Sequence, residues 1–549
     1  MSKFQSPMFG RRSFLKATAL TSGAFFINTR YSRACLAAPP ASPPTTPWLQ
    51  PLAFAPYAVP LAQGLVLDPV PDPARFQRYD EFRPLKFYEI SARTVMARPH
   101  PQLGLTEFMS YGGTVPGLTF MCDYSTPMMV RFKNELPHEL AGFGEPEMIT
   151  HVHNGNNAPE SDGFPTEHYG PGYYKDHHYP NYPAGGDSNQ RKSTLWYHDH
   201  THDYTAANTY RGLAGFYFMF DERDSGNEND PSPDAFRLPS GIPNGGNGEG
   251  CYDIPMAFAD RQFDQNGILT MDPLDMDGTI GDKWLVNGRV QPYFNVKRRK
   301  YRFRWLDAGP ARFYDLAFSN GMEFQVIATD GNMLPAPLTL NGVKLGPGER
   351  FDIVVDFAKL PASTTELYIV NRAVHATGRG PTGQTLPLNR AEKFLKIVVQ
   401  PGAVADPSRV PTTLRALPPM NLTGAVRRTW HFDRAQGMWT MNGKVFDEAT
   451  PGATIVQGRP EIWTFSTSGG WAHPAHFHVE EGRMLSYNGV PINGGLYGGR
   501  KDVFALYGGD QMEVALTYHD WIGRYVMHCH NGVHEDHGMM TWLNIVAPS

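Results

Sequence analysis

The chain has 549 residues, of which 41% are hydrophobic and 19% are charged, and its formal net charge is −5. This length predicts about three or four domains of roughly 150 residues each. The small net charge, with no block of Lys and Arg, argues against a nucleic-acid partner. The 55 glycines and 48 prolines favour short strands joined by many turns, so we predict an all-β fold.

The first residues predict an export signal. Residues 10–16 read GRRSFLK and precede an apolar run at 17–27, which is the pattern of a twin-arginine signal peptide, although Gly10 stands where Ser or Thr is usual. We predict that residues 1–38 are this signal and that the mature protein is periplasmic or secreted. Neither this run nor any later stretch reaches the roughly 20 apolar residues that a membrane span requires, so stable membrane insertion is not expected.

Three strand-rich blocks follow the signal. Residues 221–250 are dense in Gly, Asn, Asp and Pro, and residues 401–421 are rich in Pro and Ala, so both predict linkers. Within the blocks, segments such as 300–306 alternate polar and apolar residues, which predicts half-buried strands. We predict three β-sandwich domains, at residues 39–225, 226–402 and 403–549.

The sequence contains four cysteines, namely Cys35, Cys122, Cys251 and Cys529. If Cys35 leaves with the signal and Cys529 binds a metal, Cys122 and Cys251 remain as a pair in an oxidising compartment. A disulfide between these two is then plausible. The alternative is two buried free thiols.

Half of the 20 histidines fall into four short clusters. The clusters are His151 with His153; His198 with His200; His473 with His476 and His478; and His528 with His530 and His534. The last cluster also contains Cys529 and is followed by Met539. Imidazoles combined with a thiolate and a thioether are a ligand set suited to copper.

The alternation of side chains along a strand divides these ligands between two sites. His528 and His530 share one strand face while Cys529 points to the other, and His476 and His478 likewise lie opposite His473. His473 is therefore expected to join Cys529. A second site can then be formed by eight histidines: both members of the first two clusters, His476 with His478, and His528 with His530. Eight imidazoles are more than one or two tetrahedral ions require, which suggests three metal ions.

Other interpretations of the clusters have less support. A closed tetrahedral zinc site does not need a His-Cys-His triplet that splits its ligands across two strand faces. The spacing of His534 and His537 is not the five-residue spacing of a zinc protease helix. A purely structural role would require hydrogen-bond partners for each of ten buried imidazoles.

In their order along the chain, the four clusters resemble the copper motifs of the multicopper oxidase family. Segments 195–200 (LWYHDH), 210–215 (YRGLAG), 282–288 (DKWLVNG) and 439–443 (WTMNG) resemble its bilirubin oxidase and spore-coat laccase branch. The resemblance implies three cupredoxin-like Greek-key β-sandwiches, with a blue copper in the third and a trinuclear copper cluster between the first and the third. It also implies an oxidase that couples one-electron oxidation of phenolic, aminophenolic or tetrapyrrole substrates to four-electron reduction of O₂ to water.

The resemblance further implies four copper ions and a ligand set for each. The type 1 ligands would be His473, Cys529 and His534, with Met539 in the axial position. The type 2 ligands would be His151 and His476. The type 3 pair would be bound by His153, His198, His200, His478, His528 and His530.

The same resemblance assigns the transfer steps. The reductant would give its electron through His473 or His534, whose ring edges are expected to face solvent, and the electron would cross from Cys529 to His528 and His530.

Two acidic residues at family positions, Asp162 and Glu535, would deliver protons to oxygen. The alternative for both acids is a hydrogen bond that merely orients a ligand.

Some residues near the motifs have no implied metal role. Asn154 replaces the glycine that usually follows the first motif, which is expected to alter the local turn but not the ligands. His202 is expected to lie near the cluster without binding metal, and His177 and His178 are expected at the surface. His537 and Met540 are also left without a metal.

Two rival functions remain open. A metal-ion oxidase acting on Cu(I) or Mn(II) would need an acidic or Met-lined dock beside the blue copper, and Glu480 and Glu481 are the only candidates. A copper-free structural protein on the same fold predicts missing ligands, and none is missing. The expected partners are therefore a small-molecule reductant and O₂, with the protein acting as a monomer.

Overall fold

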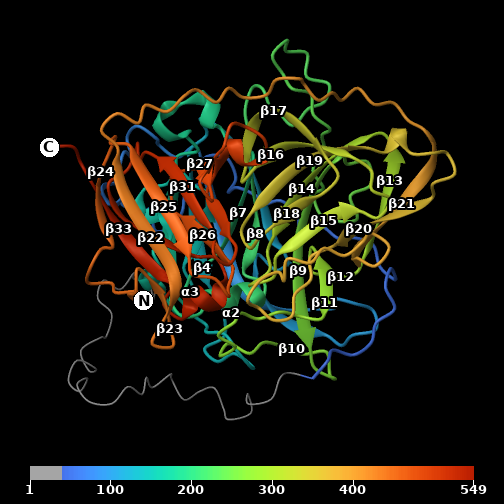
Figure 1. Cartoon of the computed structure of the whole chain (residues 1–549), viewed down its shortest axis with the longest axis horizontal. Helices are drawn as coiled ribbons and strands as arrows, with labels where there is room; N and C mark the ends of the chain where they lie inside the picture. Colours follow the sequence, from blue (N-terminus) through green and yellow to red (C-terminus); the bar gives the residue numbers. More distant parts are fainter. Residues whose placement is uncertain (1–39) are drawn as a thin grey trace.

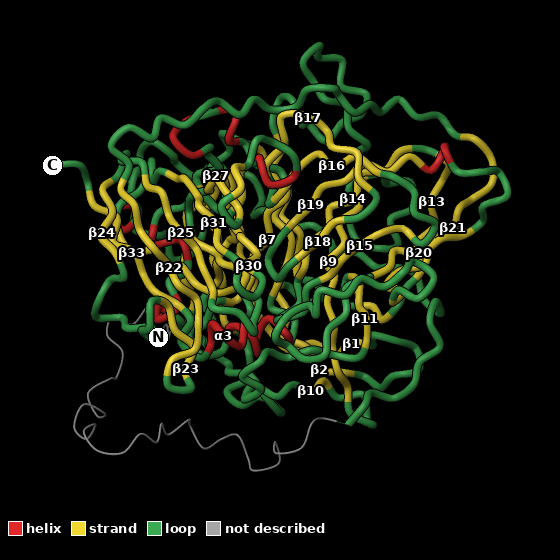
Figure 2. Tube along the Cα trace, viewed as in Figure 1, coloured by secondary structure: helices red, strands yellow, loops and turns green. Residues whose placement is uncertain are grey.

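The computed structural model describes residues 40–549, so the predicted twin-arginine signal at 1–38 lies outside the described residues. Strands far outnumber helices in the described chain, as Figure 2 shows, and the all-β prediction is confirmed. The helices are short: α1 (Pro159–Asp162), α2 (Thr205–Tyr210), α3 (Gly532–Asp536), and the 3-10 turns η1 (Pro73–Arg75), η2 (Pro165–Glu167), η3 (Ala184–Gly186), η4 (Ser188–Gln190), η5 (Phe357–Lys359) and η6 (Leu496–Gly498). None of these is long and apolar enough to cross a membrane.

The first sandwich is built from two four-stranded sheets, with the orders β2-β1-β4-β6 and β3-β8-β7-β5. Its strands are β1 (Lys86–Ala97), β2 (Thr106–Tyr111), β3 (Gly117–Asp123), β4 (Met128–Asn134), β5 (Thr150–His153), β6 (Tyr174–Tyr179), β7 (Thr194–Asp199) and β8 (Ala214–Phe220). Inward-facing side chains of both sheets, such as Phe132 of β4 and Tyr197 of β7, share one buried core. β5 and β7 therefore lie on a rigid base.

The middle sandwich is the largest. Its first sheet has the order β12-β11-β9-β14-β19-β16-β17, with β10 paired to β9, and contains β9 (Asp253–Phe263), β10 (Leu269–Thr270), β11 (Lys283–Val286), β12 (Arg289–Val290), β14 (Lys300–Asp307), β16 (Phe324–Thr329), β17 (Asn332–Leu340) and β19 (Arg350–Asp356). Its second sheet has the order β13-β21-β20-β15-β18 and contains β13 (Tyr293–Arg298), β15 (Tyr314–Phe318), β18 (Val343–Leu345), β20 (Glu366–Asn371) and β21 (Glu392–Ala403).

The third sandwich is formed by residues 426–546. One sheet has the order β23-β22-β25-β31-β27-β28, with β29 paired to β27, and contains β22 (Val426–Ala435), β23 (Met438–Met441), β25 (Glu461–Thr467), β27 (Gly482–Tyr487), β28 (Val490–Pro491), β29 (Arg500–Lys501) and β31 (Gln511–Leu516). The other has the order β24-β33-β32-β26-β30 and contains β24 (Ala453–Val456), β26 (His473–Phe477), β30 (Val503–Leu506), β32 (Gly523–Cys529) and β33 (Met540–Val546).

The three sandwiches are packed against one another. Figure 1 shows the third, in orange and red, beside the middle one, in green and yellow, with β7 and β8 of the first between them. One buried apolar cluster combines Phe108 of the first sandwich, Leu285 of the middle and Val533 of the third. These shared cores fix the relative positions of the sandwiches, because closely packed interiors deform little.

The burial of β14 differs from the sequence prediction, and the interface between the first and middle sandwiches explains the difference. The alternation at 300–306 predicts a half-buried strand, yet β14 is buried almost throughout. Arg302 pairs with Asp352 at 2.6 Å, and Arg304 binds Asp253 through two contacts of 2.7 Å. Arg304 also donates to Oγ1 of Thr194 in β7 at 2.8 Å and lies over the ring of Phe218 in β8. The first sandwich therefore covers the polar face of β14, while carboxylates of the neighbouring strands compensate its guanidinium groups.

The sequence left open whether Cys122 and Cys251 form a disulfide; in the structure they do not, and both are free thiols. Cys122 is buried with its Sγ 3.8 Å from Sδ of Met128. Cys251 is partly exposed and belongs to the edge of the middle core. The two residues therefore occupy different sandwiches, and only Cys122 matches the alternative of a buried thiol.

This arrangement predicts the labelling of the two cysteines. After unfolding without reductant, an alkylating agent should modify both Cys122 and Cys251, as located by peptide mass spectrometry, because neither sulfur is in a disulfide. In the folded protein, Cys122 should stay unmodified. Labelling that appears only after a reductant is added would contradict the structure.

Candidate metal centres

Two pairs of antiparallel strands bring the histidine clusters together. β5 pairs with β7 so that His151 is opposite His198, and β26 pairs with β32 so that His476 is opposite His528. The other members of the clusters follow immediately, since His200, His478 and His530 lie one residue beyond the ends of β7, β26 and β32. Alternation along each strand then turns both imidazoles of a pair to the same side.

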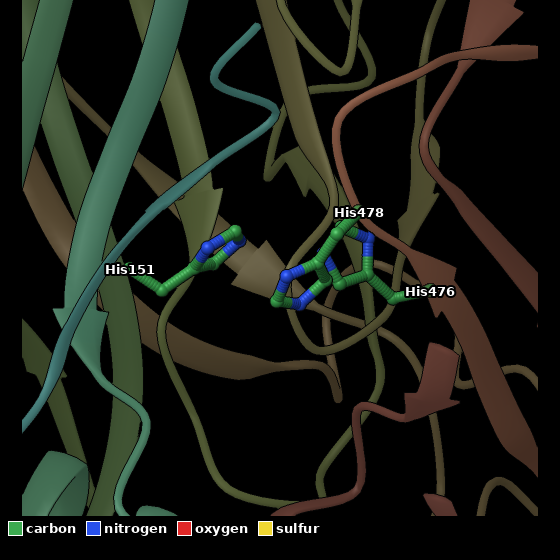
Figure 3. Close-up of side chains that lie close together, drawn as sticks. All are labelled: His151, His476 and His478. Atoms are coloured by element: carbon green, nitrogen blue, oxygen red, sulfur yellow. The ribbon is translucent and has the colours of Figure 1, made fainter. Parts of the chain in front are cut away.

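The first and third sandwiches face each other across this site. In Figure 3, His151 on the teal segment points toward His476 and His478 on the red-brown segment. The rings of His151 and His478 are stacked with centroids 3.7 Å apart, and those of His153 and His476 are 3.8 Å apart. Ligand atoms of His151, His476 and His478 lie within 4.8 Å of one another, as do those of His200, His478 and His528.

The inward nitrogens of this site have no protein partner that would explain their burial. Nε2 carries no hydrogen bond in the following histidines: His151, His153, His198, His476, His478 and His530. The Nε2 atoms of His200 and His528 lie 3.2 Å from each other. Because buried polar atoms are almost always paired, eight converging imidazoles with free inward nitrogens fit bound metal ions.

The outward nitrogens are held in place. Nδ1 of His151 lies 2.6 Å from the carbonyl oxygen of Asp162, and Nδ1 of His478 lies 2.7 Å from its carboxylate. Nδ1 of His198 lies 2.7 Å from the carbonyl oxygen of Asp199. An acceptor at Nδ1 fixes the tautomer whose bare Nε2 can bind a metal, and it also fixes the ring orientation.

Burial lowers the pKa of these imidazoles. The pKa of His198 falls to about 4, and that of His151 lies well below its ordinary value because of burial and then the neighbouring histidines. The same direction holds for His153, His200, His476, His478 and His530. These seven imidazoles are therefore neutral at neutral pH, which is the form that binds metals.

A second, smaller site lies on the other face of β32. Sγ of Cys529 is 3.4 Å from Nδ1 of His473 and 3.5 Å from Nδ1 of His534, and the two Nδ1 atoms are 3.2 Å apart. Met539 is fully buried in the same core, and its carbonyl oxygen accepts a hydrogen bond from the Cys529 N–H at 3.0 Å. A compact triangle of one sulfur and two nitrogens beside a methionine suits copper.

The histidines of this smaller site do not face solvent, contrary to the sequence prediction. His473 is 1% exposed and His534 is fully buried. The ring of Trp439 lies 3.8 Å from that of His534, and Trp471 packs edge-on against Trp439 at 5.3 Å. The Trp439 ring also lies 5.5 Å from that of His473, so it packs against both imidazoles, and the partly buried Trp471 is the more exposed member of the tryptophan pair.

Asp162 and Glu535 both contact histidines of the large site. Oδ2 of Asp162 accepts from His478, whereas its Oδ1 has no hydrogen-bond partner. Burial raises the pKa of Asp162 well above its ordinary value. The Glu535 carboxylate lies 2.9 Å from Nδ1 of His528 and 3.5 Å from Nδ1 of His200.

Histidines outside the two sites have other contacts. His177 and His178 are buried, so the prediction that they lie at the surface is wrong. Nδ1 of His177 lies 2.9 Å from the carbonyl oxygen of Ser161, and Nε2 of His178 lies 2.6 Å from that of Phe82. The His177 ring and the backbone N–H of His178, which donates to Oγ of Ser161 at 2.8 Å, hold the segment that carries Asp162 on β6, whereas the His178 ring contacts Phe82. No sequence motif indicated these roles.

Three further residues near the motifs, His202, His537 and Met540, have contacts outside the two sites. His202 is partly exposed with Nδ1 3.0 Å from Oδ1 of Asp203. Nδ1 of His537 lies 2.8 Å from the carbonyl oxygen of Val533. Met540 is buried in an apolar cluster with Trp542.

Glu480 and Glu481 do not form an exposed acidic dock. Both are buried; Glu480 accepts from the backbone N–H of His519, and Glu481 from the amide of Asn154 at 2.7 Å.

Asn154 itself has a φ of 67°, a left-handed conformation that glycine favours and asparagine tolerates. Its amide also donates to the carbonyl of Asp330 at 2.8 Å. Asn154, which replaces the glycine usual in the family, therefore connects the first sandwich to Asp330 of the middle sandwich and to Glu481 of the third.

The comparisons with known proteins agree with the fold and with these sites. Multicopper oxidase family models match residues 95–224 and 417–548. The chain is 32% identical over 477 residues to bilirubin oxidase of Albifimbria verrucaria, covering 83% of this chain and 76% of that protein. It is 28% identical over 539 residues to a laccase of Bacillus subtilis, covering 88% and 98%.

A solved structure supports the same fold. A laccase from Pediococcus acidilactici superimposes with a TM-score of 0.73 at 21% identity, covering 92% of this chain and 95% of that one. Together with the sequence relatives, this structural similarity shows that the chain belongs to the multicopper oxidase family. It is a copper-dependent oxidoreductase with cupredoxin-like domains.

Proposed function

We propose that this protein is a laccase-like oxidase that takes single electrons from an organic reductant at the Cys529 site and reduces O₂ to two waters at the eight-histidine site. The observation that carries this proposal is the converging set of buried imidazole nitrogens without protein partners. Bound copper would supply the one-electron redox chemistry at both sites. The relatives named bilirubin oxidase and laccase support organic reductants as substrates.

The proposal includes four copper ions with the ligands implied by the family motifs. The donor sets fit, because the Cys529 triangle supplies one thiolate and two imidazoles, and the large site supplies eight imidazoles. Type 1 would use His473, Cys529, His534 and Met539; type 2 would use His151 and His476; and type 3 would use His153, His198, His200, His478, His528 and His530.

The backbone connects the two sites directly. His528 and His530 are the sequence neighbours of Cys529, so a path of a few covalent bonds joins its sulfur to two imidazoles of the large site. Trp439 and Trp471 extend this path toward the surface, because the histidines themselves are buried. We therefore propose that the organic reductant docks against Trp471.

Asp162 and Glu535 are placed to deliver protons. Oδ1 of Asp162 is a buried oxygen without a protein partner, and the Glu535 carboxylate touches two histidines of the large site. Each can hold a proton next to the site while keeping a ring oriented, so the two roles proposed from the sequence are compatible.

The alternative of a metal-ion oxidase has less support. It would need an accessible acidic dock, and Glu480 and Glu481 are engaged in internal hydrogen bonds.

We also propose a monomer exported by the twin-arginine pathway to the periplasm or beyond. The GRRSFLK motif supports the export route. We keep the domain limits at 225 and 402, because, apart from Ala403 at the end of β21, each sheet uses strands from only one of the three stretches.

Oxygen consumption tests the proposed activity. The copper-loaded protein should consume O₂ with phenols, o-aminophenols or bilirubin, and more slowly with Cu(I) or Mn(II), because Glu480 and Glu481, the acidic candidates for a metal-ion dock, are buried. Measurements with all five reductants in parallel decide between the two classes. Faster turnover with either metal ion would refute the organic-substrate proposal.

The variant Cys529→Ser, measured in the same oxygen-consumption assay, tests whether the Cys529 site takes part in the reaction. Loss of the thiolate should abolish the intense blue absorption and the oxidase turnover, since Cys529 is the only sulfur in contact with both His473 and His534 among the described residues. An unchanged rate of O₂ consumption would remove the Cys529 site from the mechanism.

Asp162→Asn tests proton delivery. The variant should lower the rate of O₂ reduction by about 10²–10⁴-fold, the usual contribution of a positioned acid or base. The rate of anaerobic reduction of the Cys529 site, which is measured as the bleaching of its blue absorption, should equal that of the wild type. If the variant instead loses copper in proportion to activity, Asp162 only orients His478.

A further inference from the structure

The middle sandwich contributes none of the proposed ligands, yet one of its side chains reaches the large site. Arg350, the first residue of β19, is fully buried. Its Nη1 lies 2.9 Å from Oδ1 of Asp502 and 3.1 Å from Nδ1 of His153. Its Nη2 lies 3.3 Å from Oδ2 of Asp502, so the guanidinium holds that carboxylate with both arms.

The contacts of His153 define its tautomer. Nδ1 of His153 lies 2.8 Å from Oδ2 of Asp502. A bare Nδ1 would set its lone pair against this carboxylate, whereas an Nδ1–H donates to it. Asp502, the shorter of the two contacts at Nδ1, therefore favours the tautomer in which Nε2 is bare, and Nε2 of His153 is the atom that has no protein partner. The 3.1 Å approach of the Arg350 guanidinium to the same Nδ1 is then a packing contact and not a hydrogen bond, because both nitrogens carry protons.

Asp502 also holds a second histidine. Its carbonyl oxygen lies 2.8 Å from Nδ1 of His476, whose Nε2 is likewise without a partner. The rings of His153 and His476 are stacked at 3.8 Å with an interplanar angle of 12°. One residue thus supports two adjacent imidazoles, one by its side chain and one by its backbone.

The backbone around Asp502 is itself fixed by the middle sandwich. The Asp330 carboxylate accepts from the N–H groups of Arg350 at 3.0 Å, Asp502 at 3.3 Å and Val503 at 3.2 Å. The Lys501 ammonium lies 2.8 Å from the same carboxylate. Asp330 therefore clamps the start of β19 to the segment between β29 and β30.

We infer that Arg350 and Asp502 form a positioning pair through which the middle sandwich orients His153 and His476 and so sets the copper affinity of the large site. This inference rests on the proposed copper-binding function. Arg350 also compensates the Asp502 charge, which would otherwise be buried without a partner. Lysine cannot replace it fully, because an ammonium does not bind a carboxylate as a planar fork.

Asp502→Asn is the first test, since it keeps size and shape but weakens the acceptor for His153. The full-length copper-loaded protein is titrated with a copper chelator while metal content, the type 2 electron paramagnetic resonance signal and the blue absorption are recorded. The large site should release copper about 10–100-fold more readily than in the wild type, the usual effect of losing such a supporting contact. The type 2 signal should change shape, because His153 is stacked on the proposed type 2 ligand His476 and its displacement shifts that ring, and the blue absorption should persist.

Arg350 variants test whether the two residues act together. Arg350→Met should weaken copper retention in the same range, and Arg350→Lys should restore part of it. In Arg350→Met combined with Asp502→Asn, the loss should be smaller than the product of the two single losses, because groups in direct contact are not additive. If Arg350→Met does not fold, Asp502→Asn alone still decides the question.

Arg304 and Asp253 provide a matched control. This pair is equally buried and is joined by two contacts of 2.7 Å. Its other polar partners are Thr194, Asp352 and Arg302, none of which is a proposed ligand. Asp253→Asn should lower the thermal stability of the metal-free protein but leave copper retention and the type 2 signal unchanged.

Two results would overturn the inference. One is wild-type copper retention with an unchanged type 2 signal in Asp502→Asn, and the other is an equal copper loss in Asp253→Asn, which would indicate general destabilisation. Failure of the proposed function is distinguishable, because the wild-type protein itself would then bind no copper at the large site.

Discussion

Eight imidazoles packed into a dry interface are the constraint on which the rest of the structure depends. Each inward nitrogen must lack a proton and a protein partner, and each ring must be held from its other side. The carbonyls of Asp162, Asp199 and Asp502, and the carboxylates of Asp162, Asp502 and Glu535, lie beside Nδ1 in seven of the eight rings. Burial keeps the shifted imidazoles neutral, so the site can take cations without displacing protons from these rings.

This constraint gives each sandwich a distinct role. The first and third sandwiches supply the rings, and β32 in the third places Cys529 on one face while its neighbours serve the other. The middle sandwich supplies no proposed ligand, but Arg350 and Asp330 hold the segment that carries Asp502. The packing of the three sandwiches into shared cores is therefore needed for metal binding, because it keeps the histidines of the first and third sandwiches at fixed distances across the site.

The sequence predicted the local chemistry well and the tertiary surroundings poorly. The period of two along a strand separates Cys529 from His528 and His530, so that division needed no tertiary information. The burial of His473 and His534 depends on tryptophans from separate segments, and the burial of Arg302 and Arg304 depends on partner carboxylates in other strands and loops. Arg350 and Asp502 lie in no motif, and their contact with His153 exists only after three sandwiches meet.

The most direct test of this account is X-ray diffraction from crystals of the copper-loaded protein, with anomalous scattering recorded on both sides of the copper absorption edge. The account predicts four anomalous peaks that vanish below the edge: three enclosed by the eight imidazoles and one between Cys529, His473 and His534. Peaks that persist below the copper edge, or an absence of peaks among the eight imidazoles, would contradict it.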